Sequence, residues 1–212
     1  MTTQPGWVEF SNDLFKIEAA NDDFNDNSVN TKKWVNSFVS NIVETNSRLE
    51  LTTNTTSGYF NLDSNDYYDA RSSFVQAKLL DAGAQGQTSF EAYPVSITQD
   101  GNNQVSWMIS GNTVFARKKV AGVSTTVGSS FAYIAATHKY FRIRESGGTT
   151  FWDYSTDGLA WTNQTSVANP ITMTAVKVGP IVGTWQNEGS TGTMKLDDFN
   201  LRPFNAFHLA SD

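Results

Sequence analysis

Few side chains in this sequence of 212 residues could take part in metal or nucleophilic chemistry. The absence of cysteine excludes a disulfide framework, a thiolate zinc site and a cysteine nucleophile. Two histidines are too few for a three-histidine zinc site. A Ser-His-Asp site would need His138 or His208, and neither lies near a nucleophile elbow. We therefore interpret them as a turn histidine and a tail histidine.

Aromatic side chains beside polar groups are the residues that could bind a glycan, because sugar rings pack on flat faces and their hydroxyls need polar partners. Trp185 is our preferred exposed aromatic residue, since it lies with Asn187 in a Gly-flanked polar loop. Trp152 and Tyr154 share one face of a predicted strand and form either a stacking platform or cross-strand packing.

Other residues have a weaker claim on a glycan. Tyr67 and Tyr68 are further aromatic candidates, whereas Trp107 is expected in the core. Arg142 and Arg144 point to the face opposite Phe141, where they meet either acidic sugars or, more often, internal carboxylates.

Composition excludes several classes of protein. Hydrophobic residues make up 39% and aromatic residues 13% of the chain, too much for a disordered protein. The net charge of −6 argues against a nucleic-acid partner, which requires a basic face. No apolar run approaches the roughly 20 residues that membrane insertion needs. The N-terminus has no secretory signal, so we expect synthesis in a host cytoplasm.

The elements that must position these residues are β-strands. Apolar and polar residues alternate with a period of two, so that Val105, Trp107 and Ile109 share one face. Turn sequences such as Asp100-Gly101 and Asp157-Gly158 separate the strands. The pattern predicts strands over 48–52, 73–80, 90–98, 104–110, 113–121, 140–145, 149–155, 175–184 and 193–202, and no clear helix.

Several segments carry a family resemblance through their order along the chain. They are NDDFNDNS (21–28) with KW (33–34), SRLEL (47–51), YFRIRE (140–145), YSTDG (154–158) with Trp161, and LDDF (196–199). In this order they resemble concanavalin A-like lectin/glucanase domains, specifically the laminin-G-like jelly rolls found on bacterial and phage proteins. The resemblance implies an all-β, two-sheet antiparallel jelly-roll sandwich over 21–203. Residues 1–20 would form an N-terminal arm or extra strand, and 204–212 a C-terminal tail.

The glucanase branch of this fold places its carboxylates by alternation on one strand, as in Glu-x-Asp-x-Glu. We find no such spacing here, and the adjacent Asp197 and Asp198 would point to opposite faces of a strand. We therefore expect no enzymatic activity.

Because the first and last strands of jelly rolls commonly lie together, Asp22 or Asp23 could approach Asp197 or Asp198. These four residues would hold a structural calcium, our only cofactor candidate, unless they cap turns or meet Lys195.

The functional expectation combines the fold with the apolar ends of the chain. We expect a non-enzymatic, lectin-like protein on the surface of a phage virion, in contact with bacterial surface polysaccharide. Other virion proteins would be its partners, and a homo-oligomer is compatible with this arrangement. Its terminal docking residues would be Trp7, Phe10, Phe15, Phe204 and Phe207. One alternative is a capsid decoration module without sugar binding, and a second is a glycan hydrolase with an unrecognised site.

Overall fold

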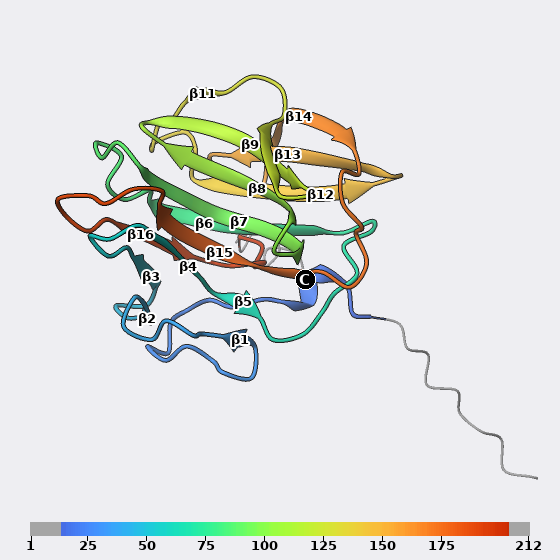
Figure 1. Cartoon of the computed structure of the whole chain (residues 1–212). Helices are drawn as coiled ribbons and strands as arrows, with labels where there is room; N and C mark the ends of the chain where they lie inside the picture. Colours follow the sequence, from blue (N-terminus) through green and yellow to red (C-terminus); the bar gives the residue numbers. More distant parts are fainter. Residues whose placement is uncertain (1–13, 204–212) are drawn as a thin grey trace, which may run out of the picture.

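A computed structural model describes residues 14–203 and contains two large antiparallel sheets, which confirms the predicted jelly-roll sandwich (Figure 1). Sheet I has the order β10-β9-β8-β7-β15-β4, with β11 paired to β9, and sheet II the order β14-β13-β12-β6-β16-β3-β2. Sheet I consists of β4 (Gly58–Asn61), β7 (Phe90–Asp100), β8 (Asn103–Ser110), β9 (Thr113–Val120), β10 (Val123–Thr126), β11 (Phe131–Ala132) and β15 (Lys177–Thr184). Sheet II consists of β2 (Ile42–Glu44), β3 (Leu49–Thr52), β6 (Phe74–Asp81), β12 (Tyr140–Ser146), β13 (Thr149–Ser155), β14 (Thr162–Ala168) and β16 (Thr193–Asp197).

Strand alternation builds the core between the two sheets. Val105, Trp107 and Ile109 of β8 are fully buried, as their shared face predicts. The indole Nε1 of Trp107 donates to the backbone oxygen of Arg142 on sheet II at 3.0 Å. In the opposite direction, Trp152 of β13 donates to the backbone oxygen of Ser106 on sheet I at 3.0 Å. The two tryptophans therefore satisfy their only polar atoms across the sandwich.

The first described residues pack on the sandwich. Ile17 lies in the 3-10 helix η1 (Ile17–Ala19) and is fully buried in the core. Lys16 forms a β-bridge with Asp69, and Asp22 forms one with Phe199. The beginning and the end of the described chain thus lie side by side. Between the sheets' ends, β1 (Trp34–Val35) pairs with β5 (Asp63–Ser64) in a small additional sheet.

The structure also contains strands that the sequence did not predict. Residues 58–64 belong to β4 and β5, and 162–168 to β14, where we expected loops. Conversely, the strand predicted over 193–202 ends at Asp197, because Asp198 and Asn200 have positive φ angles of 48° and 53°. Within residues 14–203, no helix is long and apolar enough to cross a membrane.

Candidate functional site

A groove of about 630 Å³ lies on the outer face of sheet I. Strands β4, β15, β7, β8, β9 and β10 form its floor, and the loops after β5 and β7 form its rim. Its lining combines tyrosines, amides and both signs of charge, namely Tyr59, Asn61, Asp63, Tyr67, Tyr93, Gln104, Lys119 and Lys177 among others. A groove with flat aromatic faces and convergent polar groups suits a glycan better than an apolar ligand.

One row of residues across three strands organises this groove. Gly183 of β15 is paired with Tyr59 of β4 on one side and with Glu91 of β7 on the other. A Cβ atom at Gly183 would lie only 2.1 Å from the ring of Tyr59. The ring therefore lies directly over this glycine, which allows the Tyr59 hydroxyl to donate to Glu91 Oε2 at 2.8 Å. The ring itself is 45% exposed to solvent.

Glu91 is the carboxylate at the centre of the row. Tyr93, on the same face of β7, also donates its hydroxyl to Glu91 Oε2, at 2.6 Å. Burial, followed by the charge of Glu91, raises the pKa of both tyrosines, so both remain hydroxyl donors. The two rings lie 6.4 Å apart in a tilted-edge arrangement that fixes both hydroxyls on one oxygen. Within residues 14–203, oxygen Oε1 of Glu91 accepts no hydrogen bond and is therefore open to the hydroxyl group of a ligand.

Asp63 is the carboxyl group on the other side of β15. Burial raises its pKa, although nearby Lys177 and a hydrogen bond from Asn61 oppose this effect. The Nζ atom of Lys177 lies 5.2 Å from the ring centroid of Tyr67, which is half exposed at the rim. A half-buried carboxyl group with a raised pKa is suited to donating a proton.

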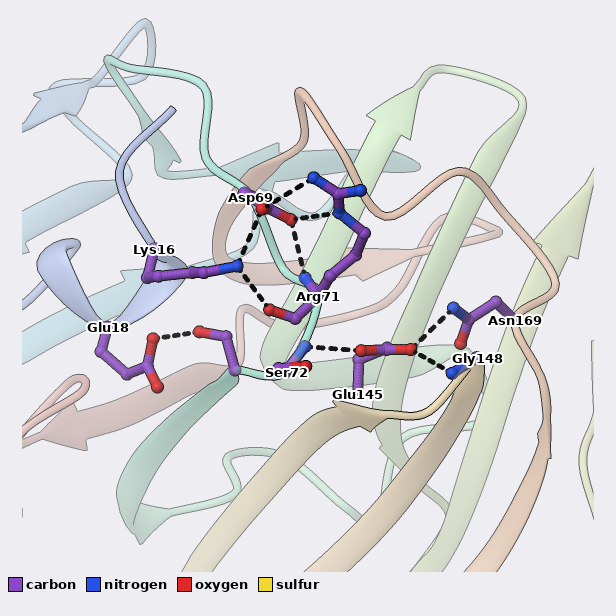
Figure 2. A network of polar contacts seen from close by, with 9 residues as sticks. Lys16, Glu18, Asp69, Arg71, Ser72, Glu145, Gly148 and Asn169 are labelled. Atoms are coloured by element: carbon purple, nitrogen blue, oxygen red, sulfur yellow. Dashed lines mark hydrogen bonds and ion pairs between the residues drawn. The ribbon is translucent and has the colours of Figure 1, made fainter. Parts of the chain in front are cut away.

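A second group of carboxylates lies where the N-terminal segment meets sheet II (Figure 2). Asp69 accepts bonds from Lys16 Nζ at 2.8 Å and from Arg71, and these contacts hold its pKa well below the usual range. Glu145 accepts bonds from the amides of Ser72 and Gly148, at 2.6 and 2.7 Å.

Hydrogen bonds likewise lower the pKa of Glu145 despite its burial, and Asn169 contributes one of them (Figure 2). Glu18 bonds the hydroxyl of Ser73 in the same cluster. Asp69 and Glu145, which are hydrogen-bonded and have lowered pKa values, hold neighbouring segments together and are poor proton donors. We therefore interpret this cluster as structural.

Trp152 cannot bind a glycan, because it is fully buried between the sheets, and its prediction as a glycan ligand was wrong. Tyr154 is half-buried and packs against Phe131 and His138, with ring centroids 5.3 and 4.9 Å away. The Tyr154 ring therefore takes part in side-chain packing and does not form a stacking platform for a sugar.

Of the other aromatic candidates, Tyr67 lines the groove and Tyr68 is buried. Trp185 is 55% exposed and directly follows β15. The Asn187 side chain accepts a hydrogen bond from the amide of Ser57 at 2.9 Å. Arg142 and Arg144 lie on the outer face of sheet II, where both bond the buried Asp153.

His138 is buried, and its Nδ1 atom accepts the amide hydrogen of Ile134 at 2.9 Å. Burial lowers the pKa of His138. The histidine lies at the end of a turn and packs among aromatic rings, as a turn histidine would. His208 lies outside the described residues.

The proposed calcium ligands are engaged with other groups. Lys78 Nζ lies 3.0 Å from Asp197 and 3.2 Å from Asp198, and therefore offsets one of the two negative charges of this acidic pair. Asp22 accepts a hydrogen bond from Trp34 Nε1 at 2.7 Å. Among residues 14–203, no group of three or more metal-ligating side chains is present. A structural calcium that also involves Asp23 stays a prediction.

Only one of the predicted docking residues is described. Phe15 is 73% exposed, and its backbone oxygen accepts the amide hydrogen of Asp69. Trp7, Phe10, Phe204 and Phe207 lie outside the described residues. Docking through the termini, virion partners and a virion location stay predictions.

Sequence reasoning missed Glu91, Tyr59 and Asp63. Glu91 lay in a predicted strand, but the expected pattern was several carboxylates alternating on one strand. Strand β7 presents Glu91, Tyr93 and Ser96 instead, and therefore has a single carboxylate at these positions. Tyr59 and Asp63 lay in a segment interpreted as loop. The alternation of Tyr59 with Asn61 around buried Phe60 was the available signal for β4.

Comparisons with known proteins support the fold. No protein-family model matches the chain, and no curated protein matches it. Among solved structures, the GH43 protein BlXynB from Bacillus licheniformis is similar with a TM-score of 0.65 at 15% identity. The match covers 93% of this chain but only 40% of BlXynB, so this chain spans less than half the length of that protein.

Two glucanase-type structures match over nearly their whole length. The β-glucanase of Bacillus licheniformis has a TM-score of 0.63 at 12% identity, and covers 89% of this chain and 97% of its own. LamAcat from Zobellia galactanivorans has a TM-score of 0.59 at 10% identity, and covers 89% and 96%. At such identities the likeness shows a concanavalin A-like glucanase-type fold.

These comparisons correct the functional expectation. We expected a non-enzymatic, lectin-like virion protein, but the similar structures are GH43 and GH16 glycosidases. They favour the glycan hydrolase alternative over the lectin and decoration alternatives. The expectation relied on the absence of one carboxylate spacing, and that spacing is not the only way in which this fold can bring two carboxyl groups to a groove.

Proposed function

We propose that this chain is a glycan hydrolase that binds a polysaccharide along the groove of sheet I. The observation that carries the proposal is the Tyr59–Gly183–Glu91 row, in which an aromatic ring that lines the groove is hydrogen-bonded to a carboxylate. The similarity to glucanases supports the substrate class, because it places this groove on a fold used for glucan cleavage. β-Glucans are therefore the first substrates to test.

Two carboxyl groups, Asp63 in the groove and Glu91 bonded to two of its tyrosines, differ in a way that suggests their roles. Asp63 would be the general acid that protonates the leaving oxygen, because burial raises its pKa. Glu91 would be the base, since two tyrosine hydroxyls donate to one of its oxygens as they would to a carboxylate. Lys177 beside Asp63 would stabilise the carboxylate that remains after proton transfer.

Glu91 and Asp63 lie on opposite sides of β15, and not on one strand as in the Glu-x-Asp-x-Glu pattern. Each carboxyl group is therefore tested by a variant of its own.

The test is reducing-sugar release from mixed-linkage β-glucan and β-1,3-glucan by the full chain. We expect Glu91→Gln and Asp63→Asn each to lower kcat about 100-fold or more, with the circular dichroism spectrum unchanged. Asp100→Asn is the matched control, because Asp100 also lines the groove but accepts bonds from Asn102 and Asn103 of its own turn. Its rate should stay within about twofold of wild type.

Two outcomes would contradict the proposal. Binding of these glucans without release of reducing ends would refute hydrolysis, and wild-type cleavage by Glu91→Gln would refute the assigned site.

A further inference from the structure

A second cavity, of about 220 Å³, lies on the outer face of sheet II, on the opposite side of the sandwich from the groove. Residues of β6, β12, the β13–β14 loop and the end of the described chain line it, namely Phe74, Gln76, Arg142, Leu159, Trp161 and Arg202. We call this cavity the arginine pocket. The glycan hydrolase proposal does not use it.

Aromatic rings hold both of its arginines in place. The guanidinium carbon of Arg142 lies 4.0 Å from the ring centroid of Trp161. That of Arg202 lies 5.4 Å from the ring centroid of Phe74. Trp161 is itself fixed, since its Nε1 atom donates to the backbone oxygen of Gly158 at 3.1 Å. Stacked guanidinium groups are preorganised, so little side-chain freedom is lost when a ligand binds them.

The local positive charge exceeds the negative charge that neutralises it. Asp153 is buried, and its Oδ2 atom accepts bonds from Arg142 Nη2 and Arg144 Nε, both at 2.8 Å. One carboxylate thus serves two guanidinium groups. Burial lowers the pKa of Arg142, and the charges of Arg144 and Arg202 add to this effect against the attraction of Asp153.

Donors remain available to a ligand. Within residues 14–203, neither Nη1 of Arg142 nor the guanidinium group of Arg202 has a hydrogen-bond acceptor. The described lining of the pocket contains no carboxylate. Asp157, in the adjacent loop, accepts the amide hydrogens of Leu159 and Ala160 and so serves its own turn.

From this geometry we propose that the arginine pocket binds one acidic sugar unit through its carboxylate. The planar forks of Arg142 and Arg202 match the two oxygens of a carboxylate. Leu159, which is 49% exposed, and Trp161 provide an apolar wall for the C–H face of the sugar ring. The volume is below the range of about 300–1,000 Å³ typical of drug-sized ligands, and therefore fits a single unit.

The test is titration of the full chain with glucuronate, followed through the indole N–H signal of Trp161 in nitrogen-15 NMR. Glucose, acetate and inorganic phosphate are the comparison ligands. We expect glucuronate to bind at least tenfold more tightly than any of them, because only glucuronate supplies both the carboxylate and the ring. Because monosaccharides contain no glycosidic bond to cleave, the result is independent of the proposed hydrolysis.

Variants assign the binding to the pocket. Arg202→Gln should weaken glucuronate binding at least tenfold, and Arg202→Lys less, because the lysine keeps the charge but loses the fork. The matched control is Arg48→Gln, which removes a surface arginine paired with Glu50 beside β3 of the same sheet and should leave the affinity unchanged. Wild-type affinity in Arg202→Gln would overturn the proposal. Equal or tighter binding of phosphate, acetate or glucose would overturn the acidic sugar as its ligand.

Discussion

Gly183→Ala tests whether the tyrosine that lies over this glycine organises the groove. The new Cβ atom would lie 2.1 Å from one ring atom of Tyr59 and 2.6 Å from two others. Ordinary contacts begin near 3.4 Å, so the ring must move by more than about 1 Å. Tyr59 is at the surface and can turn away, which would break its hydrogen bond to Glu91. The aromatic face of the groove would be lost with it.

Two opposing contributions determine the effect of Gly183→Ala on stability. The lost bond to a half-exposed carboxylate costs about 1 kcal/mol, and the weakened contact with Tyr93 about 0.5 kcal/mol. Alanine in a strand gains about 0.5–1 kcal/mol over glycine by restricting the unfolded chain. The free energy of unfolding should therefore fall by about 1 kcal/mol or less, whereas glycan binding and cleavage should fall about tenfold or more.

Urea denaturation and a glucan binding and cleavage assay measure the two effects separately. Gly189→Ala is the matched control, because a Cβ atom there meets no atom within 4 Å. The double variant with Tyr59→Phe supplies the decisive comparison. If Gly183→Ala acts through the Tyr59 hydroxyl, the two changes are non-additive in stability. Additive losses, or full binding and cleavage in Gly183→Ala, would refute the reasoning.

Three further predictions concern stability. Asp69→Asn should lower the free energy of unfolding by about 1–2 kcal/mol at pH 7, against less than about 0.5 kcal/mol for the exposed control Asp81→Asn. The folded pKa of Asp69 is lowered, so the loss of stability in Asp69→Asn should shrink as the pH falls below about 4, the pKa of an unfolded aspartate. A loss that does not change with pH in urea titrations would contradict this prediction. In the same assay, Trp152→Ala should lower the free energy of unfolding by about 3–5 kcal/mol and Trp185→Ala by less than about 0.5 kcal/mol, because only Trp152 is buried. Similar losses in the two variants would contradict this prediction. The folded pKa of Asp63 is raised, so the stability contributed by its protonated form is present at low pH and is lost as the pH rises through the folded pKa. Asp63→Asn should therefore unfold at a higher urea concentration than wild type at pH 7. A lower urea midpoint would contradict this.

Local pattern determined much of the fold. The period-two alternation around Trp107 and the Asp-Gly turns require only nearest neighbours along the chain, so they predicted β7, β8 and β9 and the buried face of β8. The short strands β4 and β5 were missed because their residues are polar and prefer turns in isolation. Pairing of β4 with β15 and of β5 with β1 makes them strands, and this pairing is invisible to local sequence.

The position of each tryptophan depended on the tertiary structure. The sequence favoured Trp185 as an exposed residue and left Trp152 open between a stacking platform and packing; Trp185 is exposed, and Trp152 is fully buried. The strand alternation that places Trp152 on one face does not say which face meets the other sheet. Packing of sheet II on sheet I made that choice, because it gave the indole nitrogen of Trp152 an acceptor on β8.

The sequence by itself determined that the chain is a β-sandwich without cysteine chemistry, since composition and alternation are local properties. Only the tertiary structure decided where its chemistry lies. Tyr59, Glu91 and Gly183 are separated by 32 to 124 residues and meet because three antiparallel strands align in one register. Register between distant strands depends on the packing of the whole sandwich, and the row that forms the candidate site exists only once that packing is complete.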